Sequence, residues 1–334
     1  MRALAILAYL AVTGGLTAAD YRVVDRIAVG GEGSWDYLTV DRDGHRLFVS
    51  HGTHVAVIDL QTGKPVADIP NTPGVHGITL AQPLQRGFIS CGRANHVLIF
   101  DLKTLKPLGE VSTGENPDAI LFDAASGRLF TFNGRSKDST VIDAASGKVL
   151  ATIPLGGKPE FSAVDGHGKL WVNIEDTHEI VELNTAKATV TRRYPLTGCE
   201  EPSGLALDAK KLRLFSVCGN EVMVVSDIAT GKVIAKLPIG EGSDGVAFDA
   251  ERGMAFSSNG SGTLTVVAEA GAGYKVAATL PTERGARTIT LDPGSHKLYS
   301  PTAQFGPVPA ATAQQPHPRP PALPGTFHLL VIGQ

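Results

Sequence analysis

The sequence predicts an all-β protein, a seven-bladed β-propeller whose blades each contain four strands. Three observations predict this fold: a repeat of about 42 residues, a short apolar run closed by Asp in most units, and a Thr/Ser-x-Lys turn further along most units. A period of 40 to 45 residues built from short alternating runs is typical of a propeller blade. The seven anchor positions lie 40 to 43 residues apart and are Asp41, Ala81, Asp123, Asp165, Asp208, Asp249 and Asp292.

The bulk composition suits one large β domain over residues 20–334. Of the 334 residues, 43% are hydrophobic and 38 are Gly, which fits many short strands joined by tight turns. The formal net charge is −3, so the chain has no basic field of the kind that binds nucleic acid.

The first 19 residues read as a secretory signal peptide. Arg2 supplies the positive charge, the stretch 3–16 is mostly apolar, and small residues precede Asp20. The apolar stretch is shorter than the ~20 residues of a membrane-spanning helix. An uncleaved N-terminal anchor is the alternative. We therefore expect an exported protein, periplasmic or secreted, with no membrane segment after cleavage.

The third unit shows the predicted blade most clearly. Its four strands are expected at 118–123, 128–132, 139–143 and 148–153, joined by Gly-containing or polar turns. The Asp123 carboxylate is expected to accept hydrogen bonds from turn amides. Pro154 is expected to end the outer strand, where a missing N–H does least harm.

The two ends of the chain are expected to complete one blade. Residues 286–292, 297–300 and 326–332 supply three strands, and residues 21–29 read as an outer strand without inner partners. Placing that N-terminal strand on the C-terminal blade closes the ring and leaves no open sheet edge.

A proline-rich loop interrupts the last blade. Eight of the 25 residues in 301–325 are Pro, so the segment is expected to run as an extended loop rather than a strand. Its position between the second and third strands puts it on the channel-mouth face. It is either a cover over that mouth or a surface strap.

Several repeat segments resemble a known family. Gly127-Arg128-Leu129-Phe130 and Val141-Ile142-Asp143 look like the YVTN-type β-propeller repeats of YncE-like exported bacterial proteins, although the YVTN tetrapeptide itself is absent. The resemblance covers nearly all of the chain after residue 19 and implies a propeller fold and export. It implies little about activity, because the fold hosts binding modules and enzymes alike. YncE-like proteins have been associated with DNA binding, but the acid-leaning charge argues against nucleic acid here.

One polar residue per unit is expected at the mouth of the central channel. These residues stand five positions before each anchor and are Asp36, His76, Asp118, Glu160, Ser203, Asp244 and Arg287. A second set, ten positions after most anchors, is expected at the same face and comprises His51, Cys91, Asn133, Cys218, Asn259 and Thr302. Such a convergence predicts a ligand site. The alternative is a wet channel mouth lined by polar side chains without a ligand.

No cofactor is identified from the sequence, but a divalent cation is one candidate ligand. A hard cation would prefer the carboxylates of Asp36, Asp118, Glu160 and Asp244. Zinc would require His51, His76 and Cys91 from neighbouring blades, and no local ligand spacing supports it. No Cys-x-x-Cys-His motif is present, so any haem would belong to another chain.

Three cysteines predict one disulfide and one free thiol. Cys199 lies nine residues before Asp208 and Cys218 ten residues after it, which brings both to the same end of one hairpin. Cys91 is expected to stay free. Three reduced, buried thiols are the alternative.

The sequence therefore predicts a binding or interaction module with its ligand face at the channel mouth. The partner would be a small molecule or a protein, and the oligomeric state is open. The first alternative is a metal-dependent hydrolase or lactonase that uses the acidic ring. The second is a partner domain of a periplasmic redox system. Serine-nucleophile catalysis finds no support, because no Gly-x-Ser-x-Gly motif occurs.

Overall fold

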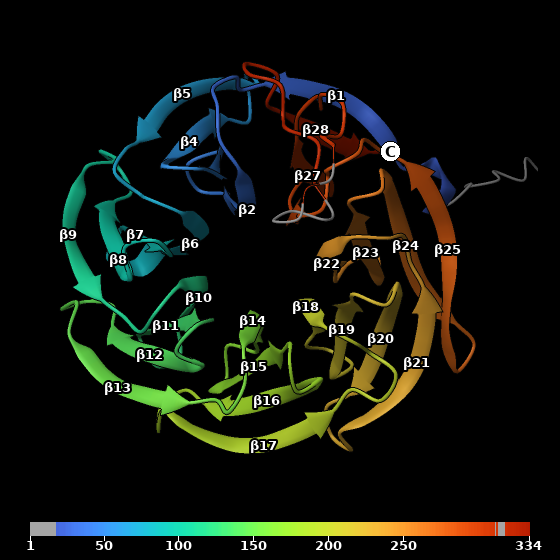
Figure 1. The fold of residues 1–334 in the computed structure, drawn as a ribbon. Helices are drawn as coiled ribbons and strands as arrows, with labels where there is room; N and C mark the ends of the chain where they lie inside the picture. Colours follow the sequence, from blue (N-terminus) through green and yellow to red (C-terminus); the bar gives the residue numbers. More distant parts are fainter. Residues whose placement is uncertain (1–17, 311, 313–317) are drawn as a thin grey trace, which may run out of the picture.

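The computed structural model describes residues 18–310, 312 and 318–334. Seven four-stranded antiparallel sheets stand around a central channel as the blades of a propeller (Figure 1). The predicted fold class is confirmed. Six blades use four consecutive strands, and the seventh joins both ends of the chain.

The strands run from the channel outward in each blade. Blade one contains β2 (Trp35–Asp41), β3 (Arg46–His51), β4 (His54–Asp59) and β5 (Lys64–Ile69). Blade two contains β6 (Val75–Ala81), β7 (Arg86–Cys91), β8 (His96–Asp101) and β9 (Pro107–Ser112), with the 3₁₀ turn η2 (Gln82–Leu84) after β6. Blade three contains β10 (Pro117–Asp123), β11 (Arg128–Asn133), β12 (Asp138–Asp143) and β13 (Val149–Pro154).

The remaining blades follow the same order. Blade four contains β14 (Pro159–Val164), β15 (Lys169–Ile174), β16 (Glu179–Asn184) and β17 (Thr189–Pro195). Blade five contains β18 (Pro202–Asp208), β19 (Arg213–Cys218), β20 (Val222–Asp227) and β21 (Lys232–Pro238). Blade six contains β22 (Ser243–Asp249), β23 (Met254–Asn259), β24 (Thr263–Ala270) and β25 (Gly273–Pro281). Blade seven contains β26 (Thr290–Asp292), β27 (Lys297–Thr302), β28 (His328–Gly333) and β1 (Arg22–Ala28).

The anchor aspartates hold the turns between inner and second strands. The Asp123 carboxylate accepts hydrogen bonds from the amide of Ala125 and from the amide and hydroxyl of Ser126. The core fills the space between blades, where Phe48 of blade one and Phe100 of blade two lie 5.5 Å apart between ring centroids. Each blade is therefore stabilised by its neighbours rather than by a core of its own.

The N-terminal strand closes the ring as predicted. β1 pairs antiparallel with β28 from Arg22 opposite Gly333 to Ala28 opposite His328. Tyr21 packs edge-on against Phe256 of blade six, and its hydroxyl accepts a hydrogen bond from Arg252. The N-terminal segment thus pairs with blade seven and packs against blade six.

The inner strand of blade seven is shorter than the predicted 286–292. β26 begins only at Thr290, because the carbonyls before it bond elsewhere. The Arg287 carbonyl accepts from the amide of Gly245 in blade six, and the Thr288 carbonyl accepts from the hydroxyl of Ser300. These bonds take the place of a ladder with β27.

The predicted disulfide between Cys199 and Cys218 is present, with 5.4 Å between the Cα atoms, and Cys91 is a buried free thiol. Residues 1–17 of the predicted signal segment lie outside the described residues; Ala18 and Ala19 form the 3₁₀ turn η1 with Asp20. Within the described ranges, no helix combines the length and apolar character that a membrane crossing requires.

Candidate functional site

The mouth of the central channel holds a cavity of about 1060 Å³. All seven residues predicted from the repeat line it: Asp36, His76, Asp118, Glu160, Ser203, Asp244 and Arg287. They come from seven different blades, so the repeat alone brings them into one ring. The cavity lies at the upper end of the size range of small-molecule sites.

Serine hydroxyls of the second strands fix the backbone that carries the ring. The Ser50 hydroxyl accepts from the amide of Asp36, and the Ser90 hydroxyl donates to the carbonyl of Asp118 in the next blade. The Ser258 hydroxyl donates in the same way to the carbonyl of Arg287. The Ser50 bond lies within blade one, whereas the Ser90 and Ser258 bonds cross to the next blade and position Asp118 and Arg287 relative to it.

Glycines that follow ring residues let neighbouring inner strands approach closely. A Cβ on Gly204 would lie 2.7 Å from the carbonyl oxygen of Asp244, and one on Gly245 would lie 2.8 Å from the amide nitrogen of Ile289. Any larger residue would push these strands apart. The small residues thus set the diameter of the ring.

Two aromatic rings meet across the channel. Tyr37 of blade one and Phe161 of blade four lie 4.6 Å apart between ring centroids. Only 7% of Tyr37 is exposed. Burial, together with the charges of Asp244, Asp36, Asp118 and Glu160, raises the pKa of the Tyr37 phenol well above its usual value. Tyr37 therefore presents a neutral hydroxyl to the ring of carboxylates.

His76 lies between two carboxylates. Its Nδ1 is 2.6 Å from Asp36 Oδ2 and 3.6 Å from Asp118 Oδ1. Burial opposes a charge on His76, but the hydrogen bond to Asp36 and the charges of Asp118 and Asp36 outweigh it and raise the pKa of His76 to about 9. Burial and the nearby carboxylates of Asp36 and Asp244 raise the pKa of Asp118 to about 7, although the charge of His76 opposes this.

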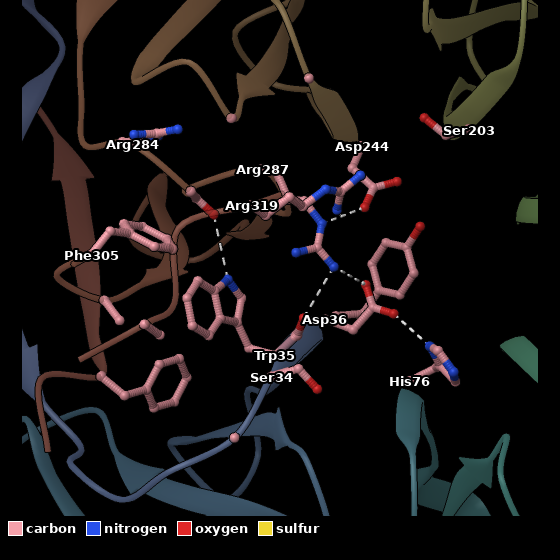
Figure 2. A pocket seen from close by; sticks show the side chains of 18 of the residues that line it. Ser34, Trp35, Asp36, His76, Ser203, Asp244, Arg284, Arg287, Phe305 and Arg319 are labelled. Atoms are coloured by element: carbon pink, nitrogen blue, oxygen red, sulfur yellow. Dashed lines mark hydrogen bonds and ion pairs between the residues drawn. The ribbon is translucent and has the colours of Figure 1, made fainter. Parts of the chain in front are cut away.

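Arg287 neutralises the opposite part of the ring. Its Nε donates to Asp244 Oδ2 at 2.8 Å, and its Nη2 lies 3.7 Å from Asp36 Oδ1 (Figure 2). Nη2 also donates to the Trp35 carbonyl at 3.1 Å, which joins blade seven to blade one. Arg287 is therefore both an ion-pair partner and a link at the closure of the ring.

A further group of charges, formed by Lys158, Glu160 and Glu175, was not predicted from the repeat. Lys158 Nζ lies 2.8 Å from Glu160 Oε1 and also pairs with Glu175. Burial and the charge of Asp118 raise the pKa of Glu160 to about 9, helped by a hydrogen bond with Glu175 and opposed by Lys158. Lys158 and Glu175 stand in loops outside the ring register, so only the proximity of Lys158 to Glu160 in sequence hinted at this group.

The raised pKa of Glu160 predicts a pH dependence of stability. Between its ordinary pKa of 4.5 and about 9, the folded protein holds a proton that the unfolded chain has released. This contribution is complete below pH 4.5 and is lost as the pH rises towards 9. We expect the thermal midpoint of metal-free protein to fall between pH 5 and 9, and to fall less in Glu160→Gln. An equal fall of the thermal midpoint in both proteins would contradict the raised pKa of Glu160.

Described residues of the proline-rich segment form one wall of the cavity. Phe305 bridges to Ala322, and the amide of Leu323 donates to the carbonyl of Gln304. Figure 2 shows Phe305 and Arg284 on one side of Trp35, and the charged ring residues on the other. Further wall residues are Arg319, Pro320, Pro324 and Phe327. The cavity thus has a charged side and an aromatic side.

The second predicted set does not reach the cavity, and that prediction was wrong. His51, Cys91, Asn133, Cys218, Asn259 and Thr302 are all at most 1% exposed and are absent from the cavity lining. The amide of Asn133 bonds to Asp138 and Thr140 in its own blade, and the His51 ring stacks on Phe327 at 4.2 Å. These side chains are therefore buried among protein atoms and do not open onto the cavity.

The predicted metal ligands divide into separate groups. Among the described residues, the one set of three side chains whose ligand atoms all lie within 4.8 Å of one another is Asp36, His76 and Asp118. Glu160 and Asp244 instead pair with Lys158 and Arg287. His76, Cys91 and His51 form no such set within these ranges, so the zinc arrangement considered from the sequence is not assembled.

Comparison with known proteins adds support for the fold alone. No protein-family profile matches the sequence, and no curated protein matches it. Among solved structures, the chain is similar to the hydrazine synthase of Kuenenia stuttgartiensis, with a TM-score of 0.68 and 16% sequence identity. The similarity covers 82% of this chain and 92% of that chain. The protein is thus a seven-bladed β-propeller, a fold that hosts binding modules and enzymes alike.

Proposed function

We propose that the protein is a binding module that holds a small molecule in the channel-mouth cavity. The observation that carries this proposal is the cavity itself. Residues of all seven blades and of the proline-rich segment line it, and they give it a charged side and an aromatic side. A concave site with an apolar wall and a few convergent polar groups is the usual form of a small-molecule site. A protein partner at the same face is the alternative occupant.

The cavity also suggests where a ligand would lie. Trp35 and Phe305 offer apolar faces, with 6.1 Å between their ring centroids. Asp36 and Arg287 offer partly buried charges on the other side of Trp35 (Figure 2). An organic molecule with a polar end on the ring and an apolar part on the aromatic wall fits both sides.

Export is part of the proposal. The disulfide between Cys199 and Cys218 is typical of proteins from oxidising compartments. The resemblance to YncE-like, YVTN-type repeat proteins points to the same periplasmic or secreted location. The redox-partner alternative gains no support from the structural similarity, because a shared fold at 16% identity says nothing about activity.

Filling the cavity should abolish ligand binding. Ser203 is the small member of the ring, and Ser203→Phe would place an aromatic ring in the cavity. A library of small metabolites is screened by thermal shift on the wild type, and the hits are repeated on this variant. We expect hits that raise the wild-type midpoint and leave Ser203→Phe unchanged.

The matched control is Ser112→Phe, at the exposed end of outer strand β9. It should respond to ligands as the wild type does. Hits that stabilise Ser203→Phe as much as the wild type would place the ligand elsewhere. A library without any hit, together with a protein captured at this face, would favour the protein-binding alternative.

A metal-dependent hydrolase or lactonase is the second candidate function. It is favoured by a separate observation, the close grouping of Asp36, His76 and Asp118 beside the cavity. Metal-bound water is the usual nucleophile in such enzymes. Hydrolysis of a lactone panel that requires added metal and fails in Asp118→Asn would support this candidate over simple binding.

A further inference from the structure

We propose that Asp36, His76 and Asp118 bind one divalent first-row transition-metal ion, which forms the polar end of the ligand cavity. This inference deepens the proposed function, because the ion would lie in the same cavity as the small molecule. The ligand set differs from the ring of four carboxylates expected from the sequence. It comprises one imidazole nitrogen and two carboxylates from three consecutive blades.

The geometry of the three side chains is close to that of a coordination site. Nδ1 of His76 lies 2.6 Å from Asp36 Oδ2 and 3.6 Å from Asp118 Oδ1, and all three ligand atoms lie within 4.8 Å of one another. Metal–ligand bonds of about 2.0 to 2.2 Å place donor atoms about 3 to 4 Å apart. Small side-chain movements would therefore suffice to seat an ion.

The backbone that carries these ligands is fixed before any ion binds. The Asp36 amide donates to Ser50, the carbonyl of Asp118 accepts from Ser90, and the Ser90 hydroxyl also accepts from the amide of Gly77, next to His76. Preorganised ligands lose little freedom on binding, which favours a metal.

Tyr37 lines the cavity beside the ring, and its relative exposure is only 7%. Within the described residues its hydroxyl makes no hydrogen bond, and it lies among the charges of Asp244, Asp36, Asp118 and Glu160. A water or ligand oxygen in the cavity would give this hydroxyl a partner.

The charges around the ring distinguish this group from the other carboxylates. Glu160 and Asp244 have cationic partners at 2.8 Å, in Lys158 and Arg287. Within the described part of the chain, Asp118 has no cationic partner closer than His76 at 3.6 Å, and His76 already bonds to Asp36. An added cation is therefore best accommodated beside Asp118.

The donor atoms also indicate which ion fits. Calcium prefers six to eight oxygen ligands, and magnesium keeps most of its own waters. One imidazole with two carboxylates suits Mn²⁺, Fe²⁺ or Zn²⁺, with positions left open on the cavity side. Those open positions could accept a carboxylate or carbonyl oxygen of the small molecule.

The test measures metal directly on the full-length protein as purified. The protein is stripped with chelator, and binding of Mn²⁺, Zn²⁺ or Ca²⁺ alone is followed by calorimetry and elemental analysis. We expect one Mn²⁺ or Zn²⁺ per chain and weaker Ca²⁺ binding. Asp118→Asn and His76→Gln should each weaken metal binding by more than about 10-fold. Loss of a residue that only supports a metal ligand already costs about that much, so loss of a direct ligand should cost more.

Glu110→Gln is the matched variant, because it removes an exposed carboxylate of outer strand β9 that does not line the cavity. It should keep the stoichiometry and an affinity within about threefold. Thermal melting of each metal-free variant confirms folding, and Asp36→Asn provides a further ligand variant if one of the others unfolds. Electron–nuclear double resonance on the Mn²⁺ form should show a nitrogen coupling that His76→Gln abolishes.

Three results would overturn the proposal. They are a wild-type protein that binds none of these ions, binding that survives both Asp118→Asn and His76→Gln, and equal loss of binding in Glu110→Gln. A failed metal site is distinguishable from a failed ligand cavity, because the thermal-shift hits on metal-free protein and their loss in Ser203→Phe are measured separately.

Discussion

Deletion of residues 20–29 is expected to lower the thermal midpoint sharply or to cause aggregation. The deletion removes β1 and thereby exposes the edge of β28, whose unpaired backbone groups could join another chain. It also removes two core side chains, Tyr21 at 1% and Ile27 at 6% exposure. Burial of each is worth about 1.5 to 3 kcal/mol. The total is a large part of the roughly 5 to 15 kcal/mol that stabilises a typical domain.

The control for this deletion is Val24→Thr, because Val24 lies in β1 with its side chain exposed. That variant should stay within about 0.5 kcal/mol of the wild type, as surface substitutions usually do. Differential scanning calorimetry measures both. A melting curve of the deletion variant that matches the wild type would show that ring closure by β1 contributes nothing to stability.

Removal of the disulfide is expected to cost about 3 kcal/mol. Cys199 and Cys218 are 19 positions apart, and closing a loop of that length restricts the unfolded chain by about this amount. The bridge also holds one side of the cavity, since Glu201 and Gly219 next to it line the wall. Cys199→Ser/Cys218→Ser should therefore unfold at lower denaturant concentration and bind ligand less tightly.

Cys91→Ala serves as the control, because Cys91 is the free, buried thiol. It should leave the disulfide intact and reduce stability only by the small loss of side-chain packing. Peptide mapping without reduction identifies the bridge in the wild type. A bridge that includes Cys91, or three alkylatable thiols in exported protein, would contradict the pairing.

The repeat explains how much of the architecture could be predicted. Once the anchors were aligned, the cavity position of Asp36, Asp118 and Asp244 followed, because identical register places identical positions at the channel. The disulfide followed for the same reason, since both cysteines flank one anchor. The closure by β1 followed from the strand count, because the last unit lacked a fourth strand and residues 21–29 lacked inner partners.

The parts outside the repeat could not be predicted. Lys158 and Glu175 come from loops, and Phe305 and Arg319 come from the proline-rich segment. No periodicity indicates the position of residues in these parts of the chain. The predicted metal ligands were incomplete for the same reason, since the pairing of Glu160 depends on Lys158. The second predicted set failed on side-chain direction. Its residues are buried, and Asn133 and Asn259 bond to side chains of their own blades instead of reaching the cavity.

The measurement that tests the ligand cavity most directly is the fluorescence of Trp35. The chain has two tryptophans, and Trp171 is buried in blade four, so Trp171→Phe leaves Trp35 in the cavity wall as the single reporter. Titration of this variant with the small molecules that stabilise the protein should change the Trp35 emission, and Ser203→Phe should abolish that change. Binding that stabilises the protein, leaves Trp35 emission unaltered and survives Ser203→Phe would contradict a ligand site at the channel mouth.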